Sequence, residues 1–226
     1  MFSLRDTLAN RPLPKGYNKG MGILVLCGNR PVSITCLRNS SCPESFVVHF
    51  KSVIPIDSWV DKCINQSLIA MQRLFAKGNI AVLRGTTEDL SDDPNTQSLQ
   101  DLYIGAQGNT KDVDTLIGYQ NYVGYDDVII YIVKKITMAP TALGDSPDGT
   151  TIEQINGAAV IAKDDPWVIP HEIGHILGLP HIYYDPKRLM FPTSSEARWT
   201  NWEIDPLVLS TDEYLDMKNS GITKSC

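Results

Sequence analysis

The chain has 226 residues, of which 42% are hydrophobic and 20% are charged, and its formal net charge is -6. This length and composition predict a globular protein with one sizeable core, and the negative charge without a Lys/Arg cluster argues against a nucleic-acid partner. No apolar run approaches the roughly 18 residues of a membrane span, and residues 22–27 are too short for a signal-peptide core, so we expect neither in this chain.

The first part of the chain carries few regular patterns until a strand, a helix and a second strand follow one another. Residues 1–43 are rich in proline and glycine, and we interpret them as an N-terminal extension of unknown role. Residues 45–54 are β-branched and aromatic and predict a strand. Apolar residues at helical spacing predict a helix over 59–76, capped by Asp57 or Ser58. Residues 80–83 predict the next strand, and this order favours a right-handed parallel crossover.

The second half alternates polar segments with short apolar ones. Residues 85–124 are polar and acidic, and we expect a solvated loop region there. Residues 127–136 carry the strongest strand pattern, which predicts a central strand. A loop over 138–154 precedes a short strand at 156–162, and Ser210 is expected to cap a final helix.

A motif of eleven residues, His-Glu-Ile-Gly-His-Ile-Leu-Gly-Leu-Pro-His, begins at His171. His171 and His175 would lie on one face of a helix, so both imidazoles can reach one metal ion. The carboxylate of Glu172 lies beside the first ligand, where it can act as a general base without binding the metal. Gly178 can adopt the left-handed conformation that ends a helix, which lets His181 approach the same ion. Three nitrogen ligands with one open position are typical of a catalytic zinc site.

Chance is a poor explanation for the full motif, although a histidine in a helix is commonly an ordinary polar residue. Three histidines, a glutamate and a glycine at these fixed positions should occur by chance in roughly one chain of this size in 10⁵. His49, the fourth histidine, lies inside a predicted strand and is expected to be packed or solvated without binding metal.

The motif resembles the signature of the metzincin metallopeptidases, in which a methionine turn follows the third histidine. The segment Arg188 to Pro192, Arg-Leu-Met-Phe-Pro, follows after a short loop and resembles the Leu-Met-Tyr-Pro segment of the matrix metallopeptidases in sequence and spacing. In that family the methionine packs beneath the zinc ligands, so the resemblance assigns this role to Met190. It also implies an α/β (α+β) fold for residues 44–226, with a twisted, mostly parallel sheet, two long helices, an active-site helix and a C-terminal helix.

The resemblance further implies where a substrate would bind. In the family a strand before the active-site helix forms the upper edge of the cleft and hydrogen-bonds an extended peptide. This role falls on Gly157, Ala158 and Ala159, with an ordinary covered edge strand as the alternative. A calcium ion held by Asp145 and Asp148 is conceivable in the preceding loop, but no recognisable calcium motif supports it.

Five cysteines allow at most two disulfides within the chain; they are Cys27, Cys36, Cys42, Cys63 and Cys226. A bridge between Cys63 and Cys226 resembles an arrangement in the astacin branch of the family. The sequence after Cys27 distantly resembles the cysteine switch of matrix metallopeptidase propeptides, but the preceding Pro-Arg is absent. Disulfides would suit a secreted protein.

Together these features predict a secreted, monomeric zinc endopeptidase that acts on proteins or peptides. Two alternatives stay open: a toxin or effector peptidase with one narrow protein target, and a non-catalytic zinc-binding module. The module is disfavoured because a structural zinc site more usually has a fourth protein ligand and has no need of Glu172.

Overall fold

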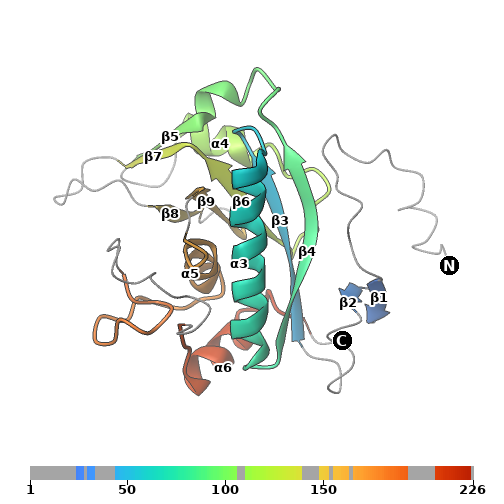
Figure 1. The fold of residues 1–226 in the computed structure, drawn as a ribbon, viewed down its shortest axis with the longest axis vertical. Helices are drawn as coiled ribbons and strands as arrows, with labels where there is room; N and C mark the ends of the chain where they lie inside the picture. Colours follow the sequence, from blue (N-terminus) through green and yellow to red (C-terminus); the bar gives the residue numbers. More distant parts are fainter. Residues whose placement is uncertain are drawn as a thin grey trace.

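The computed structural model describes residues 24–27, 30–33, 44–105, 110–138, 148–152, 155–162, 165–192 and 207–224. Figure 1 shows a central sheet with one long helix lying across it. The backbones of β1 (Leu24–Cys27) and β2 (Arg30–Ser33) form a separate antiparallel hairpin.

The central sheet has five strands in the order β4-β3-β6-β9-β8. They are β3 (Glu44–Ser52), β4 (Ile80–Asp89), β6 (Val128–Val133), β8 (Gly149–Ile152) and β9 (Gly157–Ile161). The first four strands of this order are parallel, and β8 runs antiparallel to β9 at the edge. β6 lies in the middle and all its residues are buried, which confirms the predicted central strand.

The helix α3 (Ser58–Ala76) covers one face of this sheet (Figure 1). Asp57 Oδ1 accepts the backbone N–H groups of Trp59 and Val60, both at 2.9 Å, so the predicted cap and helix are confirmed. Alternate residues of β3 and β6 pack against the apolar stripe of α3, because side chains of a strand point to opposite faces in turn. This contact forms the larger of two hydrophobic clusters.

The opposite face is covered by a region that the sequence predicted as loop. It contains the 3₁₀ helix η1 (Gln97–Gln100), the strand β5 (Asp101–Ile104) and the helix α4 (Lys111–Ile117). β5 pairs in parallel with β7 (Lys135–Met138), which lies outside the predicted loop region. The loop prediction for residues 85–124 is therefore wrong in part. β4 also continues into its polar half, because Thr87, Glu88 and Asp89 all pair with β3.

The edge-strand prediction for Gly157, Ala158 and Ala159 is wrong. These residues lie in β9, which pairs with β6 on one side and β8 on the other, and all three are buried. The edge strand on this side of the sheet is β8, whose four residues lie in the predicted loop and include only one large apolar side chain, Ile152. A strand this short and polar gives no periodic signal.

The remaining two helices of the part of the chain that the structure describes are α5 (Val168–Ile176) and α6 (Thr211–Asn219). Ser210 caps α6 in a capping box with Glu213, as predicted. The expected mixed α/β fold with a mostly parallel sheet is confirmed. Among the described residues, no helix combines the length and the apolar character that crossing a membrane requires.

Candidate metal centre

The helix α5 carries the first two histidines of the motif. Asp165 Oδ1 accepts the backbone N–H of Trp167 at 2.9 Å just before the helix begins, and the Trp167 side chain is buried. Ile169 and Ile173 are also buried in the larger hydrophobic cluster. The core therefore fixes the rotation of α5, and with it the face on which the histidines lie.

A Schellman motif ends α5 and redirects the chain. Gly178 has φ +91°, as the predicted left-handed turn requires. Its N–H donates to the carbonyl oxygen of His175, and the N–H of Leu179 donates to that of Gly174, both at 2.9 Å. The chain then returns towards the helix, which brings His181 to the other two histidines.

Replacing Gly178 with alanine is expected to lower the free energy of unfolding by about 1–2 kcal/mol, because a Cβ disfavours this backbone conformation. Urea unfolding of the two proteins measures the difference. Gly118→Ala is the matched control, since Gly118 also ends a helix but has φ -61°, and its effect should be clearly smaller. Equal stability of Gly178→Ala and the unchanged protein would contradict the role assigned to the turn.

The structure brings the three predicted imidazoles together. The Nε2 atom of His181 lies 3.2 Å from Nε2 of His171 and 3.0 Å from Nε2 of His175. Such a group could hold a metal ion. Nitrogen ligands at about 2.0–2.1 Å from a tetrahedral zinc ion would be about 3.3–3.4 Å apart, close to these separations.

Two backbone carbonyls determine which ring nitrogens face one another. His171 Nδ1 lies 2.7 Å from the carbonyl oxygen of Leu189, and His175 Nδ1 lies 2.8 Å from that of Leu179. A carbonyl oxygen only accepts hydrogen bonds, so each Nδ1 carries the proton and each Nε2 keeps a lone pair for a metal. These two carbonyl groups could not be predicted from the sequence, because every residue type has a backbone carbonyl.

Electrostatics favours uncharged imidazoles. Burial lowers the pKa of His175, a shift that its bond to the Leu179 carbonyl opposes. Burial and the neighbouring His175 both lower the pKa of His181. Neutral rings are the form that binds a cation.

The carboxyl group of Glu172 is enclosed beside the histidines. Glu172 is only 7% exposed, and this burial raises the pKa of its carboxyl group to about 8. A Cβ added at Gly149, the first residue of β8, would lie 2.7 Å from Glu172 Cγ. The edge strand and the predicted general base are therefore in direct contact, and a side chain at Gly149 would push Glu172 aside.

Met190 lies directly beneath α5. It is fully buried, and its carbonyl oxygen accepts the N–H of Ile182 at 2.9 Å. A Cβ at Gly174, between the two helical histidines, would approach Met190 Cε to 3.1 Å and Sδ still more closely. The sequence analysis did not assign a role to Gly174, although the small residue within the motif was a possible signal of close packing.

The other predicted sites stand apart from this group. His49 is 5% exposed: its Nδ1 accepts the N–H of Thr86 at 3.0 Å, and its Nε2 lies 3.2 Å from Asp127 Oδ2, so it is a packed residue as expected. Of the conceivable calcium ligands, Asp145 lies outside the described residues. The side chain of Cys27 and the whole of Cys226 also lie outside the described residues. The structure therefore does not test the cysteine switch or the predicted disulfide between Cys63 and Cys226.

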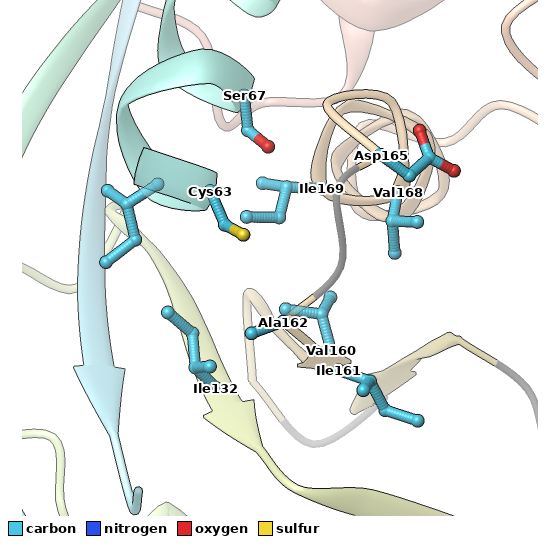
Figure 2. A pocket seen from close by; sticks show the side chains of 10 residues that line it. Cys63, Ser67, Ile132, Val160, Ile161, Ala162, Asp165, Val168 and Ile169 are labelled. Atoms are coloured by element: carbon cyan, nitrogen blue, oxygen red, sulfur yellow. The ribbon is translucent and has the colours of Figure 1, made fainter. Parts of the chain in front are cut away.

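Cys63 itself is buried beside a small cavity between α3 and α5 (Figure 2). Ser67 lines it from α3, and Val168 and Ile169 line it from α5. Its volume of about 10 Å³ is room for a single water molecule. A substrate cannot occupy it.

Comparison with known proteins supports the fold alone. No family model and no curated protein matches the chain. The chain is similar to archaemetzincin from Methanopyrus kandleri, with 14% identity and a TM-score of 0.51 over 78% of this chain and 95% of that one. It is also similar to metalloproteinase-II from Bacteroides fragilis, with 16% identity and a TM-score of 0.50 over 81% of this chain. It covers 55% of that longer protein.

Proposed function

We propose that this protein is a zinc-dependent endopeptidase in which His171, His175 and His181 hold the metal and Glu172 is the general base. The convergence of three Nε2 atoms carries the proposal. Among the described residues, no fourth His, Cys, Asp or Glu belongs to this group. Three protein ligands with a position left over are typical of catalytic zinc, whereas structural zinc usually has four.

The donor set fits zinc. Imidazole nitrogen is a common zinc ligand, and a backbone carbonyl on Nδ1 both fixes the tautomer and makes Nε2 a better donor. When bound, zinc supplies a Lewis acid that polarises a carbonyl group and makes water a stronger nucleophile.

The residues of the chain would move the proton. Glu172 accepts a proton from the attacking water and later donates it to the nitrogen of the leaving amine, so the carboxylate ends each cycle as it began. Enclosure by Gly149 limits the positions that the carboxyl group can take. The nearby positive charge of a bound cation would oppose the rise in the pKa of Glu172 that burial causes.

The edge strand β8 offers a place for the substrate backbone. Its inner side pairs with β9, and its other side has no strand partner among the described residues. An extended peptide can add to such an edge through main-chain hydrogen bonds. Gly149 at the start of β8 touches Glu172, so a peptide on this strand would pass close to the general base. β8 thus takes the role that the sequence analysis gave to Gly157, Ala158 and Ala159.

Incubation of the purified chain with a peptide library tests this function. We expect cleavage that a chelator abolishes and added zinc restores, with the products identified by mass spectrometry. Cleavage of many sequences would support a general endopeptidase, and cleavage of one narrow sequence would indicate a peptidase with a single target. Zinc binding without any cleavage would overturn the peptidase proposal and leave a zinc-binding module.

A further inference from the structure

The methionine turn contains an ion pair that the proposed chemistry does not use. Nη2 of Arg188 contacts Oε2 of Glu213 in the first turn of α6. The two side chains are only 13% and 9% exposed. Burial lowers the pKa of the Arg188 guanidinium, but the hydrogen bond and charge of Glu213, together with the nearby Tyr184 and Asp185, raise it above its ordinary value. Removing one partner of a pair so shielded from water leaves the other charge buried and unpaired, so the turn and α6 are energetically coupled.

The same oxygen of Glu213 also belongs to the helix cap. Glu213 Oε2 accepts the N–H of Ser210 at 2.6 Å and lies 3.1 Å from its hydroxyl oxygen. These two contacts hold the Glu213 carboxylate in place independently of Arg188. Arg188 is anchored to a rigid partner.

Leu189, the residue after Arg188, contacts the histidine cluster through its backbone carbonyl. The carbonyl oxygen of Leu189 accepts the Nδ1–H of His171 at 2.7 Å. The N–H of Leu189 donates to Val208 at 3.1 Å, and the N–H of Val208 donates to Lys187 at 3.0 Å, so residues on both sides of Arg188 are tied to the segment before α6. The ion pair and these two bonds hold one short piece of backbone.

We propose that Arg188 and Glu213 are positioning residues, which orient the His171 ring through the carbonyl oxygen of Leu189. This inference rests on the proposed metal-binding function of His171. If the ion pair is weakened, the Leu189 carbonyl is less well held, and the His171 ring loses the bond that aims its Nε2 at the other two rings. Loss of such an outer contact weakens metal binding by about 10- to 100-fold.

The variants can separate the ion pair from the helix cap. Glu213→Gln keeps a side-chain oxygen for the capping box but removes the charge that Arg188 contacts. Arg188→Met keeps a long side chain without charge, and Arg188→Lys restores the charge. Asp57→Ala is the first control, because it removes the side-chain cap of α3 and leaves the contacts of Arg188, Glu213 and Ser210 in place. Glu88→Gln is the second, because it weakens the buried pair of Glu88 with Lys51, which joins β4 to β3 at the end of the sheet opposite to β8.

Two measurements on the full chain test the inference. The dissociation constant for zinc alone is measured by competition with a chromophoric chelator, and the His171 Nδ1–H signal of the zinc-free protein is followed by NMR. Glu213→Gln and Arg188→Met should each weaken zinc binding by about 10- to 100-fold and weaken or abolish that signal. Arg188→Lys should recover part of both. The two controls should lower the melting temperature while leaving zinc affinity and the signal unchanged.

Unchanged zinc affinity and an unchanged His171 signal in Glu213→Gln and Arg188→Met would overturn the inference. Equal losses in the two controls would also overturn it, because they would show a general effect of lower stability. If the unchanged protein binds no zinc, the proposed function fails, while the NMR signal of the zinc-free variants still decides whether this pair orients His171.

Discussion

Replacing Glu172 with glutamine is expected to reduce peptide hydrolysis by about 10²- to 10⁴-fold while zinc stays bound. The amide has nearly the same shape as the carboxylate, so it fits the space beside Gly149, but it cannot accept the proton of an attacking water. Glu172 is not part of the histidine group that could hold the metal. The change should therefore remove the base without removing a ligand.

The measurement pairs kcat/KM on a cleaved peptide with the zinc content of each purified protein. Glu44→Gln is a suitable control, because Glu44 lies at the start of β3 and accepts a hydrogen bond from Thr223, far along the chain from the motif. It should keep the turnover of the unchanged protein. If Glu172→Gln hydrolyses peptide at the original rate with a full complement of zinc, another group must take the proton.

The histidine cluster could be predicted from the sequence because the residues that form it lie close together along the chain. His171 and His175 are separated by one helical turn, and Gly178 determines how the chain returns to place His181, so few long-range contacts enter the prediction. The same holds for α3 and α6, whose caps at Asp57 and Ser210 are formed by neighbouring residues. These elements depend little on the rest of the fold.

The errors concern features that depend on pairing between distant segments. Whether β9 is an edge or an inner strand is decided by β8, and Thr150 and Thr151 in that strand show no apolar alternation. The polar end of β4 is strand because it pairs with β3, where Lys51 contacts Glu88. Periodicity detects burial of apolar faces, and it misses strands that are stabilised by backbone pairing and buried polar contacts.

The site contains a second kind of information that a motif does not reveal. The carbonyl oxygens of Leu189 and Leu179 orient two of the rings, and any residue type could supply them. Gly174 and Gly149 are different, since each is a place where a neighbouring functional side chain leaves no room for a Cβ. Both positions require glycine, but the reason is the neighbouring side chain, Met190 at Gly174 and Glu172 at Gly149, which only the folded structure shows.

Gly174→Ala is the second change for which we expect a large effect, of about 1–3 kcal/mol in the free energy of unfolding. The new methyl group would overlap Met190, which is fully buried and has little room to move away. Because Gly174 lies between His171 and His175, the strain should also weaken zinc binding. Urea unfolding of the zinc-free protein and a chelator competition measure the two effects separately.

A double substitution identifies Met190 as the cause. Met190→Ala alone should lower the free energy of unfolding by about 2–5 kcal/mol because it leaves a cavity. Combined with Gly174→Ala, the loss should be smaller than the sum of the two by about 0.5–3 kcal/mol, since the methyl group then occupies vacated space. Met71→Ala is the matched control: Met71 is also fully buried in the larger cluster, but it is not among the atoms nearest to Gly174. Gly174→Ala should add to Met71→Ala without coupling, and equal coupling for both methionines would mean that Met190 has no special contact with the helix.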